Sequence, residues 1–161
     1  MDKRDLEQLL SDVADGAVAP AVALTRIQTA PTADLGFAQL DLSRGVRQGA
    51  GEVVYGAGKT AEQITAIIEA LRAAGQERIL VTRLDAEKAD RISELLGNGI
   101  DLGYVPDTQL ALVGGKPSPT GNGRIVVACA GTSDLPVAEE AALTAEFYGN
   151  EVGRLYDVGV A

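Results

Sequence analysis

GRIVVACAGTSDLPVAEEAALTA, residues 123–145, is the stretch that decides the fold of this chain. Its apolar run over residues 125–128 is continuous rather than alternating, which predicts a strand covered on both faces, as in a parallel sheet. Small and hydroxyl-bearing residues follow over 130–134, and a helical pattern follows them, with Pro136 in its first turn. The stretch therefore predicts a strand, a short loop and a helix of an α/β fold.

The start of this helix is a candidate anion site. Free N–H groups and a partial positive charge meet there, and a phosphate is their natural occupant. The ordinary alternative is a loop that only turns the chain and caps the helix. A carboxylate repels phosphate, so Asp134 is expected either as the helix N-cap or as an acceptor for a neighbouring ribose hydroxyl. The predicted apolar face of the helix consists of Val137, Ala141, Ala145 and Tyr148.

Composition limits the classes of function. The chain has 161 residues, 46% hydrophobic and 4% aromatic without Trp, which predicts a core of Ala, Val, Leu and Ile. A net charge of −9 argues against nucleic-acid or anionic-membrane partners. With no His and one Cys, the sequence offers no zinc-type site and no intrachain disulfide, as in cytoplasmic proteins. No signal peptide or membrane-spanning run is visible.

The N-terminal third is expected to be mostly helical. Leucines at helical spacing predict a helix over residues 2–14, and Pro20 opens a second helix to about residue 28. Residues 31–36 are expected to be loop, followed by a weakly alternating strand over 35–42. Docking or oligomer packing is the role expected for the two helices.

GAGKT, residues 56–60, is the second informative stretch, between an expected strand over 52–55 and a helix. It resembles a phosphate-binding P-loop, but that motif needs Gly where the chain has Val53. Solvated Lys59 with Thr60 as N-cap is the favoured interpretation. A contact from Lys59 or Arg47 to a phosphate or carboxylate is the alternative.

The remaining pattern predicts a small α/β domain. Strands are expected over residues 78–84, 100–105 and 110–113, and a helix capped by Asp85 extends to Leu96. With the strand and helix before them, these elements follow the order β-α-β-α-β-β.

The predicted domain organisation has four parts. They are an N-terminal helical segment (1–35), an α/β domain (36–113), a Gly/Pro-rich linker (114–123) and an incomplete strand–loop–helix unit (124–161) that ends in a new strand from residue 155. Such a unit exposes two sheet edges and a whole face. We therefore expect the sequence to be a fragment, or to be completed by a partner chain.

Long motifs of this sequence resemble the LarB family of pyridinium-3,5-biscarboxylic acid mononucleotide synthases. They are GTSDLPVAEEAALTAEFYGNEVGRLYDVGVA over residues 131–161, RQGAGEVVYGAGKTAEQ over 47–63 and VTR over 81–83. The resemblance implies that residues 124–161 begin a parallel-sheet domain similar to PurE-type aminoimidazole ribonucleotide carboxylases, with a flavodoxin- or Rossmann-like fold.

The resemblance also implies an activity in nickel-pincer nucleotide cofactor synthesis. Nicotinic acid adenine dinucleotide is carboxylated on its pyridinium ring with CO₂ or bicarbonate, and its phosphoanhydride is cleaved to release AMP. No tightly bound cofactor is implied; Mg²⁺ is a possible addition, and the assembly is expected to be a homo-oligomer.

Site residues follow from matching motif positions. The mononucleotide site is expected at Gly131, Thr132, Ser133 and Asp134, with Asp157, Gly159 and Val160 in the next loop. Arg47, Lys59 and Arg83 match the family's N-terminal motifs without an assigned role. The resemblance also implies a nucleophilic cysteine near the C-terminal end of the family's proteins, which is expected beyond Ala161. Cys129 is expected to be an inert thiol, because it lies in an apolar strand.

Two other functions stay open from the sequence. One is an aminoimidazole ribonucleotide carboxylase or mutase, against which the α/β domain before the linker counts. The other is a non-catalytic nucleotide-binding or assembly module.

Overall fold

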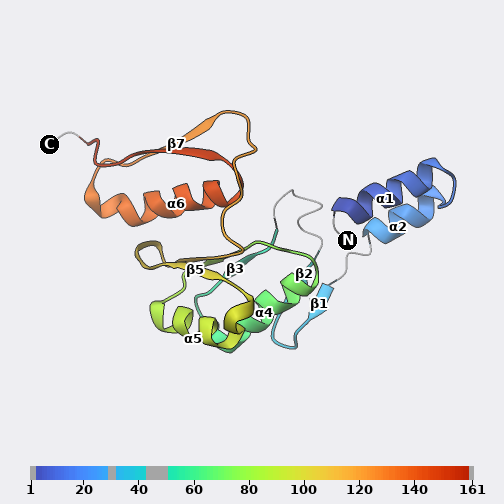
Figure 1. Cartoon of the computed structure of the whole chain (residues 1–161), viewed down its shortest axis with the longest axis horizontal. Coiled ribbons are helices and arrows are strands. Elements are labelled where there is room, and N and C mark those ends of the chain that lie inside the picture. Colours follow the sequence, from blue (N-terminus) through green and yellow to red (C-terminus); the bar gives the residue numbers. More distant parts are fainter. Residues whose placement is uncertain (1–2, 29–31, 43–50, 160–161) are drawn as a thin grey trace. The chain divides into compact units, whose positions relative to one another are not determined.

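A computed structural model describes residues 3–28, 32–42 and 51–159 of the chain (Figure 1). Its contacts divide the chain into two compact units, Met1–Glu52 with Ala66–Glu77 and Val53–Thr65 with Arg78–Ala161. Both helices and sheets are present, including parallel strands, which confirms the predicted α/β class. Among the described helices, none is long and apolar enough to cross a membrane.

The first unit contains a helical pair and a small hairpin. Helices α1 (Lys3–Ala14) and α2 (Pro20–Gln28) pack together and bury Leu9 and Ala23, which confirms both predicted helices. Strands β1 (Thr32–Asp34) and β2 (Gln39–Asp41) pair antiparallel. The loop predicted over residues 31–36 is therefore wrong at β1. The Asp34 carboxylate accepts a hydrogen bond from the Gly36 N–H at 2.8 Å, and this turn folds the chain back into a hairpin.

A four-stranded mixed sheet forms the centre of the second unit. Its order is β3 (Val53–Tyr55), β4 (Ile79–Thr82), β6 (Leu110–Val113), β5 (Leu102–Val105), with only β3 and β4 parallel. The central strands β4 and β6 are almost fully buried, which explains why their sequences are continuously apolar. Helix α4 (Ala61–Ala73) follows β3 and helix α5 (Ala86–Leu96) follows β4. Together these elements confirm the β-α-β-α-β-β order.

Two short helical turns complete this part of the chain. They are η1 (Gly97–Gly99), which leads into β5, and η2 (Pro106–Thr108), which leads into β6. Asp85 caps α5 as predicted, because its carboxylate accepts the Lys88 N–H at 2.9 Å.

The strand–loop–helix stretch folds as a parallel β-α-β unit. Strand β7 (Arg124–Ala128) leads through η3 (Thr132–Asp134) into α6 (Leu135–Phe147), and β8 (Glu151–Leu155) pairs parallel with β7. The strand predicted from residue 155 is wrong in position, since β8 ends there. Gly149, at φ 77°, turns the chain directly after α6, so the strand starts earlier.

Two predictions about burial in this unit are also wrong. The buried face of α6 consists of Ala138, Ala142, Leu143 and Phe147, whereas Val137 is 68% exposed. Strand β7 is largely exposed rather than covered on both faces. Arg154 of β8 reaches α6, so α6 lies over that face of the pair. Val126 and Leu155 alternate onto the opposite face and are 55% and 53% exposed.

Residues 114–123 lie against the end of α6. Lys116 forms an ion pair with Glu146 at 2.8 Å, and the Thr120 and Gly121 amides donate to the Gly149 carbonyl. A single apolar cluster contains Leu80 and Leu112 of the four-stranded sheet together with Leu143 and Phe147 of α6. The predicted division at residues 114–123 stays a prediction, and this cluster shows that α6 packs on the preceding sheet.

Candidate functional site

The loop between β7 and α6 presents unpaired backbone amides. Within η3 and the start of α6, the Asp134 amide donates to the Gly131 carbonyl and the Leu135 amide donates to the Thr132 carbonyl. Among the described residues, no hydrogen bond uses the amides of Thr132 and Ser133. Both residues are exposed. The predicted phosphate position therefore has accessible donors at the N-terminal end of a helix.

The loop after β8 is joined to this one. The Val158 amide donates to the Cys129 carbonyl at 3.2 Å, and the Gly159 amide donates to the Ala130 carbonyl at 2.9 Å. A Cβ on Gly159 would lie 2.5 Å from the Ala130 oxygen, so the close approach requires glycine. The structure thus brings Asp157 and Gly159 to the same end of the parallel pair as Gly131–Asp134. Val160 lies outside the described residues.

Asp134 occupies the N-cap position of α6, but its side chain makes no capping hydrogen bond. The exposed carboxylate of Asp134 therefore does not cap the N-terminus of α6. Asp157 is also exposed, with its backbone in the left-handed region at φ 57°. Cys129 is a half-buried free thiol at the end of β7.

The GKT motif forms a helix cap. The Thr60 hydroxyl accepts the Gln63 N–H at 3.2 Å, while the Gln63 side chain accepts the Thr60 N–H at 3.0 Å. This reciprocal capping box includes the N-cap predicted for Thr60. Lys59 is half-buried, and its ammonium donates to the Tyr55 carbonyl at 2.9 Å in a contact open to solvent.

Arg83 lies at the carboxyl end of β4. Its backbone is in the left-handed region at φ 55°, and its guanidinium contacts Glu140 of α6 at 2.7 Å. Arg83 thus reaches the helix that follows the loop between β7 and α6. Arg47 lies outside the described residues.

An ion-pair cluster beneath α6 was missed by sequence reasoning. Arg154 makes a two-point contact with Glu139, at 2.8 and 2.9 Å, and also bonds Glu146. The Tyr156 hydroxyl donates to Glu139 at 2.6 Å. The paired glutamates of the AEEAA segment, inside a largely apolar helix, are the signal that could have indicated such contacts.

The cluster shifts the titration of its members. Hydrogen bonds from Arg154 hold the pKa of Glu139 and of Glu146 below the ordinary carboxyl value. The same bonds raise the pKa of Arg154. Burial, and then the hydrogen bond to Glu139, raises the pKa of Tyr156 to about 12. All four groups therefore keep their ordinary charge states around neutral pH.

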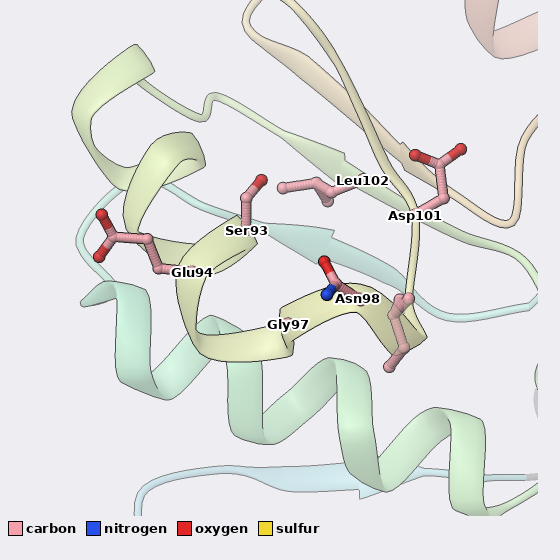
Figure 2. A pocket seen from close by; sticks show the side chains of 7 residues that line it. Ser93, Glu94, Gly97, Asn98, Asp101 and Leu102 are labelled. Atoms are coloured by element: carbon pink, nitrogen blue, oxygen red, sulfur yellow. The ribbon is translucent and has the colours of Figure 1, made fainter.

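The described residues contain no group of three or more acidic, histidine or cysteine side chains that could hold a metal ion. An open hollow of about 500 Å³ lies where α5 ends and η1 leads into β5 (Figure 2). Ser93, Asn98 and Asp101 are among its lining residues. Of the predicted site residues that the structure describes, none lines this hollow.

The fold and its loops define an α/β protein with a parallel β-α-β unit following a small mixed-sheet domain. Residues 32–113, half of the chain, match the family model of the LarB/PurE-like N-terminal domain. The chain therefore belongs to the LarB family. It is also 36% identical over 127 residues to an uncharacterised protein of Methanocaldococcus jannaschii, a match that covers 76% of this chain and 49% of that relative. The chain spans about half the length of this relative.

Proposed function

We propose that the chain is the nucleotide-binding part of a cytoplasmic LarB-type carboxylase/hydrolase. The whole protein carboxylates the pyridinium ring of nicotinic acid adenine dinucleotide with CO₂ or bicarbonate and cleaves the phosphoanhydride to release AMP. The observation that carries the proposal is the pair of accessible amides at Thr132 and Ser133, in a chain of the LarB family.

The loop between β7 and α6 supplies the contacts to the nucleotide in this proposal. The amides of Thr132 and Ser133 donate to the mononucleotide phosphate, and Asp134 accepts a ribose hydroxyl beside it. Because the chain carries a net charge of −9, its overall field repels an anionic nucleotide. Affinity must therefore come from these local donors, which act at the end of a helix where negative charge is favoured.

Calorimetric titration of the chain with nicotinic acid adenine dinucleotide and with aminoimidazole ribonucleotide tests the proposal. We expect binding of the dinucleotide in preference to the ribonucleotide, with and without Mg²⁺ in parallel titrations. Preference for aminoimidazole ribonucleotide would instead support a purine-pathway carboxylase. Binding of neither would contradict the nucleotide-binding role and favour an assembly module.

A variant then locates the site. We expect Asp134→Ala to weaken dinucleotide binding about tenfold, the loss of one hydrogen bond to a charged group. Stability should stay unchanged, because the side chain makes no capping bond. Asp107→Ala, which removes an exposed carboxylate from η2, is the matched control. Unchanged affinity in Asp134→Ala would remove Asp134 from the site.

A further inference from the structure

We propose that Arg83 and Glu140 are positioning residues, whose ion pair sets the phosphate loop at the start of α6 against the carboxyl end of β4. The inference rests on the proposed function, because it concerns the same loop. The backbone of Arg83 has a φ of 55°, a value that a residue with a side chain rarely adopts. Such a conformation persists only when its surroundings impose it.

The surroundings of Arg83 do impose it. The Gly56 amide donates to the Thr82 carbonyl at 2.7 Å, and a Cβ on Gly56 would lie 2.9 Å from that oxygen and 3.2 Å from the Arg83 oxygen. After Arg83, the Leu84 amide donates to the Gln109 carbonyl at 2.9 Å. The Tyr104 hydroxyl donates to the Leu84 carbonyl, also at 2.9 Å. The backbone is thus held on both sides of Arg83.

The held backbone directs one side chain to α6. The Arg83 guanidinium lies 2.7 Å from Glu140, whose side chain is 21% exposed. The neighbouring residue, Glu139, is bound by Arg154 of β8. Two adjacent carboxylates of α6 are therefore fixed in different directions, one by its own strand pair and one by the end of β4.

Because Glu139 and Glu140 are both held, helix α6 can neither rotate about its axis nor slide along it without breaking one of the two contacts. Thr132 and Ser133 precede α6 within the continuous turn η3–α6, so their amides move with the helix. Binding of an anion by fixed amides is sensitive to displacements of about 1 Å. Loss of the Arg83–Glu140 contact should therefore weaken nucleotide binding, although neither side chain is assigned a contact to the nucleotide.

Charge reversal and a charge swap test the inference. In Arg83→Glu and in Glu140→Arg, like charges face each other, and we expect the dissociation constant for nicotinic acid adenine dinucleotide to rise about tenfold. The double variant restores an opposite-charge pair and should return the constant to within about threefold of wild type. Melting temperatures should change little, because the Arg83 side chain is 49% exposed and ion pairs screened by solvent contribute little to stability. Arg91→Glu, at an exposed pair with Glu94 on α5, is the matched control.

Two readouts keep this inference separable from the proposed function. If the wild-type chain binds the dinucleotide and both single variants bind it equally well, the positioning role is overturned. Failure of the folded double variant to recover also overturns it. If the wild-type chain binds no dinucleotide, the proposed function fails. The positioning role is then judged by the amide NMR shifts of Gly131–Asp134, which should change in each single variant and return in the swap.

Discussion

Gly159 is the residue on which the contact between the loops after β7 and β8 depends. A Cβ there would lie 2.5 Å from the Ala130 oxygen, a backbone atom that cannot move without shifting the loop after β7. We expect Gly159→Ala to lower the free energy of unfolding by about 1–3 kcal/mol, the usual cost of forcing atoms into a packed site. Urea denaturation measures this.

Gly131→Ala is the control for this prediction. Gly131 has φ −130° and nothing within 4 Å of an added Cβ, so alanine fits there. Its unfolding midpoint should stay near wild type. Equal midpoints for Gly159→Ala and Gly131→Ala would mean that the two loops are not held together by the Gly159 contact.

Variants at Thr60 distinguish two roles of the GKT motif, a helix cap and a phosphate ligand. Its hydroxyl accepts the Gln63 N–H, so Thr60→Ala should cost about 1 kcal/mol of stability, the usual value of an N-cap. Thr60→Ser keeps the acceptor and should be near wild type. Dinucleotide affinity should be the same in all three proteins. A drop in affinity with unchanged stability in Thr60→Ala would favour the phosphate-ligand role.

Local chemistry made some residues predictable from the sequence. Thr60 and Asp85 act as caps because a cap depends on residues three positions away, which a sequence shows directly. The contacts of Arg83 and Arg154 were not predictable. Their partners, Glu140 and Glu139, are 57 and 15 residues away, and the pairing depends on how α6 lies on its neighbours.

At the scale of elements, the ion-pair cluster ties α6 to β8 in a pH-dependent way. The pKa values of Glu139 and Glu146 lie below the ordinary value of 4.5, mainly because Arg154 hydrogen-bonds them. A lowered carboxyl pKa adds stability that is fully present above the unfolded value and is lost as pH falls through the folded value. We therefore expect the urea midpoint to fall steadily below about pH 4.5.

Arg154→Met should remove about half of this pH dependence, because Lys116 and Tyr156 still contact the two glutamates. Midpoints measured between about pH 3 and pH 6 give the slope for each protein. Arg72→Met is the matched control, since Arg72 donates to the Glu77 carbonyl, which does not titrate. An Arg154→Met slope as steep as that of wild type would show that the cluster does not carry the acid sensitivity.

Element order was more predictable than burial. The strands predicted over residues 78–84 and 110–113 are present as β4 and β6, and both are buried because they lie in the middle of the sheet. The apolar run in β7 is exposed, since α6 covers only one face of the β7–β8 pair. An apolar run indicates that a strand can be buried. How many of its faces are covered depends on neighbouring elements, which the run itself does not specify. The β1 strand was missed because its three residues, Thr32–Asp34, are too few to show an alternating pattern.

At the scale of the molecule, the second unit has an apolar cluster that spans two segments predicted to be separate. Leu80 and Leu112 of the four-stranded sheet and Leu143 and Phe147 of α6 belong to one cluster. Elements that share a core tend to unfold together. The β7-α6-β8 unit should therefore not unfold independently of the four-stranded sheet that contains β4 and β6.

Phe147→Ala tests this coupling. Phe147 is 8% exposed, and its truncation should cost about 3–5 kcal/mol, as for other buried aromatic residues. Because the core is shared, hydrogen exchange should accelerate in β4 and β6 as well as in α6 and β8. Val137→Ala, at a 68% exposed site on the same helix, should change stability by less than about 0.5 kcal/mol. Faster exchange confined to α6 and β8 in Phe147→Ala would mean that the sheet holds its structure without them, and that the shared cluster does not couple the two segments.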